Sequence, residues 1–157
     1  MAIQGFSHVG VCVRDLDTST RFYEDVFGFR QLYSMDFVED EVAATMERSG
    51  AFTSRMLIRG DLRVELLWWH DTDDLRASWP APTRRAMSTP GFTHLSFRVD
   101  SVDDLSELAE RAGGAVWPLT LTVLGDPDDP AAVRLLYLTD PDGNRIEVMS
   151  GTPELPL

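Results

Sequence analysis

The amino-acid sequence predicts an α+β fold built from two tandem βαβββ modules, and three observations support this prediction. Residues 5–28 align without a gap on residues 91–114 and are identical at seven of the 24 positions, so the chain contains an internal repeat. Each copy opens with an alternation of apolar and polar residues, which is typical of a strand, and continues with a helical pattern that ends at glycine. Each copy also closes alike, because "DLRVELL" at 61–67 aligns with "GNRIEVM" at 143–149.

The first copy begins with a strand in which Val9, Val11 and Val13 alternate with polar or small residues. A helix is expected next, with Asp17 as its N-cap and Gly28 as its end. The remaining expected strands of this copy lie near residues 30–38, 55–59 and 62–68.

The second copy begins with a strand in which Leu95, Phe97 and Val99 share one face. Ser101 is the expected N-cap of the helix that follows, with Asp104 at the spacing of a capping box. The expected strands of this copy lie at 92–99, near 115–119 and 134–139, and at 143–149.

The repeat also predicts the domain organisation. Residues 1–70 form the first module, residues 71–90 a linker that contains three prolines, and residues 91–157 the second module. We expect the two modules together to make one domain, whose sheets curve into a cup.

Composition excludes several classes of protein. The net charge of −12, without an extended basic cluster, argues against binding to nucleic acid or to an anionic membrane surface. The chain has no apolar run of the roughly 18 residues that a membrane span needs, and its first residues lack the pattern of a signal peptide. A single cysteine, Cys12, suits a reducing cytoplasm. All 14 basic residues are arginine, which excludes a catalytic lysine.

Four polar residues interrupt otherwise apolar strands, and each takes the face opposite to the apolar one. These residues are His8, Glu65, His94 and Glu147. The apolar face of each strand must pack beneath a helix, so all four are expected on the side of the sheets that faces away from the helices. Taken singly, each has an ordinary explanation, because a strand histidine is usually structural and an outward glutamate is usually solvated.

Together, the four residues predict a metal site. A carboxylate in a concave site is costly unless it is paired or bound to a metal, and two imidazoles with two carboxylates suit a divalent ion of the first transition row. Nickel, cobalt, manganese, iron and zinc all remain candidates.

With these four residues in paired βαβββ modules, the chain resembles the vicinal oxygen chelate superfamily. This superfamily includes glyoxalase I, methylmalonyl-CoA epimerase, extradiol dioxygenases, and the fosfomycin and bleomycin resistance proteins. "FYEDVFGF" at 22–29 and "DPDGNRIEVM" at 140–149 resemble its most recurrent segments. The resemblance covers about residues 5–150 and implies paired βαβββ modules around a metal.

The resemblance implies metal-dependent proton transfer of the glyoxalase I or epimerase type, in a lyase or isomerase that is often a homodimer. It makes Glu147 the better base, with Glu65 as its counterpart across the metal. Glu47 lies near a second catalytic glutamate of the epimerases, although an ordinary surface charge explains it as well. The alternatives are an extradiol-type dioxygenase and a metal-free drug-binding protein like the bleomycin resistance proteins.

Further residues share the face of the expected ligands and are candidates for contact with a small-molecule substrate. Arg63, Arg98 and Arg145 suit a carboxylate or phosphate group, or else pair with some of the 26 acidic residues. Trp69 falls on the ligand side and is expected to contact an apolar part of the substrate.

Overall fold

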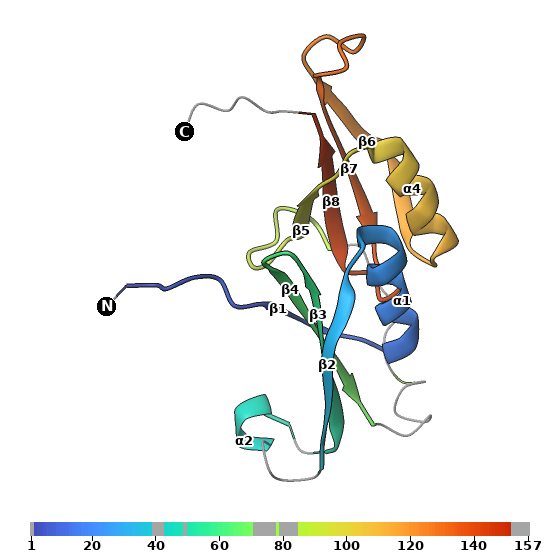
Figure 1. Cartoon of the computed structure of the whole chain (residues 1–157). Coiled ribbons are helices and arrows are strands. Elements are labelled where there is room, and N and C mark those ends of the chain that lie inside the picture. Colours follow the sequence, from blue (N-terminus) through green and yellow to red (C-terminus); the bar gives the residue numbers. More distant parts are fainter. Residues whose placement is uncertain (1, 39–42, 49, 71–77, 79–84, 152–157) are drawn as a thin grey trace. The chain divides into compact units, whose positions relative to one another are not determined.

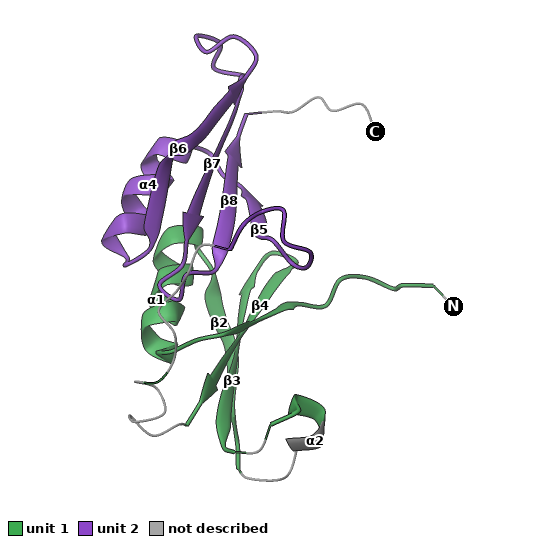
Figure 2. Cartoon of the chain, turned by 180° about the vertical axis from the view of Figure 1, so that it is seen from behind, with its two compact units in different colours: residues 1–81 green, residues 82–157 purple. Residues whose placement is uncertain are grey.

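The computed structural model describes residues 2–38, 43–48, 50–70, 78 and 85–151. The chain divides into two compact units, Met1–Ala81 and Pro82–Leu157 (Figure 2). Each unit contains one four-stranded sheet and a long helix, which confirms the expected α+β fold with two tandem modules. Most of the expected linker lies outside the described residues. Within the described part of the chain, no helix combines the length and the apolar character needed to cross a bilayer.

Unit 1 follows the expected order of elements, with one short helix added. Its elements are β1 (Val9–Cys12), α1 (Leu16–Phe27), β2 (Arg30–Phe37), α2 (Ala43–Met46), β3 (Phe52–Arg59) and β4 (Leu62–Trp69) (Figure 1). The strand order is β1-β4-β3-β2, and only β1 and β4 are parallel. The first and last strands of the unit are therefore neighbours.

Unit 2 repeats this topology. Its elements are β5 (Leu95–Arg98), α4 (Val102–Arg111), β6 (Ala115–Leu124), β7 (Val133–Thr139) and β8 (Arg145–Ser150), in the strand order β5-β8-β7-β6. Strand β6 extends well beyond the expected end at Leu119. Its pairing with β7 shifts register between Trp117 and Thr122, and this irregularity accommodates Pro118, which cannot donate a hydrogen bond to a neighbouring strand.

One face of each sheet is apolar and packs beneath the long helix of its unit, as the alternation predicts. In unit 1 the buried side chains of this layer include Val11, Val13, Phe22, Val64 and Leu66; in unit 2 they include Leu105, Ala109, Leu138, Ile146 and Val148. Because successive side chains of a strand alternate in direction, this packing directs the polar residues between them to the opposite face.

The helix caps match the prediction in unit 2 and differ from it in unit 1. Ser101 accepts a hydrogen bond from the backbone N–H of Asp104 at 3.2 Å, as expected. In unit 1 the cap is Asp15, whose Oδ1 accepts from the backbone N–H of Thr18 at 2.7 Å. The prediction for Asp17 is wrong because the helix begins at Leu16, which places Asp17 in the first turn.

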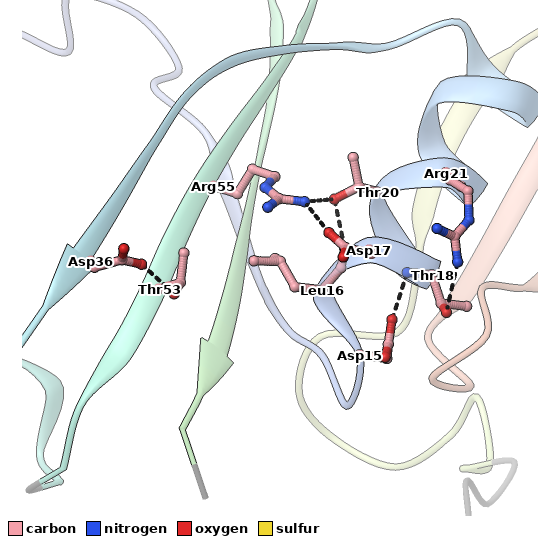
Figure 3. Close-up of polar contacts among 9 residues, drawn as sticks. All are labelled: Asp15, Leu16, Asp17, Thr18, Thr20, Arg21, Asp36, Thr53 and Arg55. Carbon is pink, nitrogen blue, oxygen red and sulfur yellow. Dashed lines mark hydrogen bonds and ion pairs between the residues drawn. The ribbon is translucent and has the colours of Figure 1, made fainter.

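Asp17 instead joins the helix to the sheet. The Arg55 side chain on β3 donates from Nη1 to Asp17 Oδ1 and to Thr20 Oγ1, both at 2.9 Å (Figure 3). Unit 2 has the corresponding ion pair between Arg134 on β7 and Asp103 on α4, at 3.4 Å. Asp17 and Asp103 are one of the identical pairs of the repeat. Their shared contact with an arginine of the sheet explains why both copies have an aspartate at this position.

Replacing the Asp15 cap is expected to destabilise the protein. The backbone N–H of Thr18 lowers the pKa of Asp15 from its ordinary value of 3.8, so the stabilisation is present above that value and is lost as the pH falls through the lowered pKa. At neutral pH, Asp15→Ala should reduce the free energy of unfolding by about 1 kcal/mol. Urea unfolding at neutral and acid pH measures this effect.

The matched control is Asp15→Asn, which keeps a capping oxygen but cannot titrate. It should retain most of the stability at neutral pH and show a weaker dependence on acid. Equal destabilisation by alanine and asparagine would contradict the capping role.

Candidate metal-binding site

The first histidine–glutamate pair is assembled within unit 1. His8 immediately precedes β1, and Glu65 lies on β4 opposite Gly10 in the parallel pairing of the two strands. His8 Nε2 lies 3.2 Å from Glu65 Oε2, and His8 Nδ1 lies 3.0 Å from the hydroxyl of Ser7. The hydroxyl of Ser54 on β3 donates to Glu65 Oε1 at 2.6 Å. The parallel pairing thus brings together two residues that are far apart in the sequence.

The second pair is assembled in the same way within unit 2. His94 precedes β5, and its Nε2 lies 3.7 Å from Glu147 Oε2 on β8, while its Nδ1 lies 2.9 Å from the hydroxyl of Thr93. Ser96 donates to Glu147 Oε2 at 2.7 Å, and the Tyr137 hydroxyl donates to Glu147 Oε1 at 2.8 Å. The Tyr137 ring also meets the His94 ring edge to face, with centroids 5.4 Å apart.

The chemistry of both pairs fits a metal ligand set. In each pair Nε2 faces the carboxylate that would share the ion, and Nδ1 faces a hydroxyl at the position where an outer partner orients a metal-bound histidine. A hydroxyl both donates and accepts, so it allows the tautomer in which Nε2 offers its lone pair to a metal. Among the described residues, no group of three or more His, Cys, Asp or Glu side chains is placed to hold an ion, so one pair alone is too few ligands.

The three candidate arginines lie in different surroundings. Arg63 on β4 is half-buried and Arg98 at the end of β5 is exposed, and neither forms an ion pair with a described residue. Arg145 at the start of β8 donates to the Arg85 carbonyl and to Met87 Sδ, and its guanidinium lies 5.3 Å from the centre of the Trp117 ring. The side chain of Arg145 is therefore engaged within its own unit.

Trp69 lies on the ligand side of β4, but other residues cover it. It is only 6% exposed and packs against Phe52, with ring centroids 5.0 Å apart. The guanidinium of Arg48 lies 4.5 Å from the centre of the Trp69 ring. Glu47 precedes this arginine, is exposed, and has a backbone φ of 55°, a conformation that a residue with a side chain seldom adopts.

Sequence reasoning missed the hydroxyl groups around the two pairs, above all Tyr137. This residue stands opposite Glu147 in the pairing of β7 and β8, but in the sequence it reads as one more apolar residue of a core strand. Burial and the hydrogen bond to the Glu147 carboxylate raise the pKa of Tyr137 to about 12. The only signal in the sequence was the place of Tyr137 between Leu136 and Leu138. A residue between two core residues of a strand points to the opposite face of the sheet.

Alkaline titration should report the contact between Tyr137 and Glu147. Because the folded pKa of about 12 exceeds the ordinary value of 10.0, the stabilisation is complete below pH 10 and is lost as the pH rises towards 12. The chain has only three tyrosines, so phenolate absorbance in the near ultraviolet follows this titration. Tyr137→Phe should remove one phenolate step near pH 12, and an unchanged titration curve in that variant would contradict the assignment.

The comparisons with known proteins agree with this architecture. The model of the Glyoxalase/Bleomycin resistance protein/Dioxygenase superfamily matches residues 5–148. The fosfomycin resistance protein FosX of Mesorhizobium japonicum is 25% identical over 153 residues, covering 96% of this chain and 88% of the relative. The metallothiol transferase FosB of Lysinibacillus sphaericus is 25% identical over 152 residues, covering 97% and 86%.

Solved structures show the same fold. A glyoxalase family protein from Bacillus cereus superimposes with a TM-score of 0.74 at 18% identity, over 96% of this chain and 95% of that chain. FosX from Listeria monocytogenes, crystallised with Mn(II) and sulfate, superimposes with a TM-score of 0.60 at 20% identity, over 98% and 97%. The repeat, the topology of both units and the match over residues 5–148 together show that the chain belongs to the Glyoxalase/Bleomycin resistance protein/Dioxygenase superfamily.

Proposed function

We propose that the protein is a divalent-metal-dependent enzyme that acts on a small anionic substrate, with His8, Glu65, His94 and Glu147 as the metal ligands. One observation carries this proposal: the repeat has kept a histidine–glutamate pair in each unit, on the sheet face opposite the helix, with a hydroxyl beside the outer nitrogen of each histidine. Nickel, cobalt, manganese, iron and zinc all suit this donor set. Manganese is the first ion to test, because a FosX relative was crystallised with it.

The metal and the protein would make distinct contributions. A divalent ion at this site would polarise substrate oxygens and stabilise negative charge that develops on them. The protein would hold the ion and orient the substrate around it. We assign Arg63 and Arg98 to an anionic group of the substrate, since both lie on the ligand face and no described residue neutralises them; guanidinium binds carboxylate and phosphate groups in a bidentate manner.

The first candidate substrate is an epoxide that carries a phosphonate, such as fosfomycin. This choice rests on the two relatives that match nearly the whole chain, a fosfomycin resistance protein and a metallothiol transferase. In such a reaction water or a thiol forms a bond to an epoxide carbon, the carbon–oxygen bond breaks, and the released oxygen takes up the proton that the nucleophile gives up. The arginines would bind the phosphonate.

The second candidate is proton transfer next to a carbonyl, as in glyoxalase I or methylmalonyl-CoA epimerase. The presence of a second carboxylate, Glu65, favours it. Both oxygens of Glu147 accept hydroxyl hydrogen bonds, so each of them is already held by a donor. Glu65 accepts one such bond, so we prefer Glu65 as the proton acceptor, and Glu47 is the candidate for the second proton-transfer group.

Metal analysis combined with a substrate panel tests the proposal. Untagged protein is analysed for metals before and after chelation, reconstituted with each of the five ions, and assayed with fosfomycin in water and with added thiols. A hemithioacetal and an α-acyl thioester in heavy water test proton transfer. We expect metal-dependent turnover in one of these assays, without oxygen uptake.

Two other outcomes would overturn the proposal. Failure to bind any of the five ions, together with tight binding of an intact drug, would identify a binding protein of the bleomycin resistance kind. Stoichiometric oxygen consumption with a catechol would identify an extradiol-type dioxygenase.

We further propose that both pairs contribute to each metal site, from one chain or from the two chains of a homodimer.

A further inference from the structure

The two histidine–glutamate pairs are held to different degrees, and this difference assigns them different roles. We infer that the second pair, His94 and Glu147, is the pre-formed anchor of the metal site, and that the first pair, His8 and Glu65, is its adjustable half. The inference rests on the proposed metal site and adds a division of labour to it. It also makes Ser96 and Tyr137 positioning residues for metal binding.

The anchor pair is held through nearly all of its polar atoms. Glu147 accepts a hydroxyl hydrogen bond at each carboxylate oxygen, from Ser96 at 2.7 Å and from Tyr137 at 2.8 Å. The His94 imidazole is held at Nδ1 by the Thr93 hydroxyl at 2.9 Å and packs against the Tyr137 ring. Both donor groups of the pair are therefore restrained before any ion arrives.

The first pair has fewer restraints. Glu65 accepts a hydroxyl hydrogen bond only at Oε1, from Ser54, and Oε2 faces the His8 imidazole at 3.2 Å. The His8 ring has no aromatic neighbour comparable to Tyr137 among the described residues. The side chains of His8 and Glu65 are 37% and 22% exposed, against 24% and 14% for His94 and Glu147.

The repeat identifies what the first pair lacks. Residues 5–28 align with residues 91–114, so Gly10 occupies the position that Ser96 holds in the second copy. A Cβ atom added at Gly10 would lie 3.9 Å from Glu65 Oε2 and from Leu67 Cδ1, which is ordinary van der Waals contact. There is room at this position for the missing hydroxyl-bearing side chain.

Restraint before binding has a thermodynamic consequence. A ligand group that is already fixed loses less conformational entropy when it binds a metal, and the outer partners that fix it contribute to the affinity. The second pair should therefore set the affinity for the ion. The first pair keeps freedom to shift as substrate and product exchange.

Substitutions of the hydroxyl groups test this division. Ser96→Ala and Tyr137→Phe should each weaken metal affinity by about 10–100-fold, whereas Ser54→Ala in the first pair should weaken it by less than about threefold. Ser96→Thr keeps a hydroxyl and should retain most of the affinity. Titration with Co(II), followed by its visible absorption, measures affinity and coordination geometry without reference to turnover.

A gain of affinity provides the complementary test. Gly10→Ser should place a hydroxyl near Glu65 Oε2 and tighten metal binding by roughly two- to tenfold, the ratio expected from one ordinary net hydrogen bond. Gly10→Ala fills the same space without a hydroxyl and should leave the affinity unchanged. Circular dichroism on every variant verifies that the fold is intact.

The outcomes separate this inference from the proposed function. Equal losses from the substitutions in both pairs, or no gain with Gly10→Ser, would overturn the division of labour while the metal enzyme stands. Failure of the wild-type protein to bind any of the five divalent ions would overturn both.

Discussion

His94→Ala is expected to abolish metal binding while leaving the protein folded. The variant removes one of the four proposed ligands and half of the anchor pair. The loss of metal affinity should therefore be larger than the loss of about 10–100-fold that follows from changing an outer partner of a ligand. Packing in this region comes from the opposite face, where Ile146 and Val148 are fully buried. The free energy of unfolding should therefore change by less than about 1 kcal/mol. Metal titration and urea unfolding of the same sample measure both effects.

The chain offers a matched control in its third histidine. His70 is exposed and lies on the helix side of its sheet, where its Nε2 is 2.8 Å from the Thr53 hydroxyl. His70→Ala removes the same group outside the proposed site and should leave metal affinity unchanged. If His94→Ala unfolds the protein at room temperature, the histidine is a structural residue.

Mixing two inactive variants would show how many chains build each site. His8→Ala and His94→Ala each lack one ligand. If one site draws its two pairs from two chains of a homodimer, a mixed dimer contains one site with both histidines, and metal binding recovers on co-expression. If each site belongs to a single chain, no mixture recovers it.

Glu65→Gln is expected to lower the turnover rate by about 10²–10⁴-fold with metal still bound, if proton transfer is the reaction, because an amide cannot accept the proton that a general base removes. The amide oxygen can still coordinate an ion and accept the hydrogen bond from Ser54. Deuterium incorporation from heavy water into the product should fall in parallel. Rate and isotope exchange are measured at saturating metal.

Glu147→Gln serves as the comparison. The two oxygens of Glu147 accept hydrogen bonds from the hydroxyls of Ser96 and Tyr137. In glutamine a nitrogen replaces one of these oxygens, and an amide nitrogen cannot accept a hydrogen bond. This variant should act mainly through weaker metal binding, and excess metal should restore much of its rate. The reverse pattern, with Glu147→Gln inactive at full metal occupancy and Glu65→Gln active, would make Glu147 the base.

Most of the fold could be predicted from the alternation of apolar and polar residues along the strands. Val9 and Val11 had to face a helix, so His8 had to face the other way, and the same reasoning placed Glu147 opposite Ile146. Side-chain contacts could not be predicted in this way, because the alternation along a strand shows which face a residue occupies but not which residues it contacts. The sequence therefore left two partners open for Arg145, an anionic substrate group or an acidic side chain, whereas the guanidinium reaches Met87 and the Arg85 carbonyl.

The hydroxyl partners escaped prediction for a related reason. Ser96, Tyr137 and Ser54 acquire their roles from cross-strand neighbours, and register is a property of the folded sheet. The N-cap of α1 was missed because Asp15 and Asp17 both suit the position, and only the backbone reveals where the helix begins. The end of β6 was missed because the strand continues past Leu119 through a shift of register between Trp117 and Thr122, which appears only in the folded sheet.

The neighbouring first and last strands of each unit have a consequence for biosynthesis. In unit 1 the partner of β1 is β4, so the nascent chain cannot complete this sheet until Leu62–Trp69 has left the ribosome. Contacts between such distant segments form slowly, and a chain interrupted earlier would carry His8 without Glu65. Each half of the proposed metal site thus matures only with the closing strand of its own unit, so the His8–Glu65 half is completed before the His94–Glu147 half during synthesis.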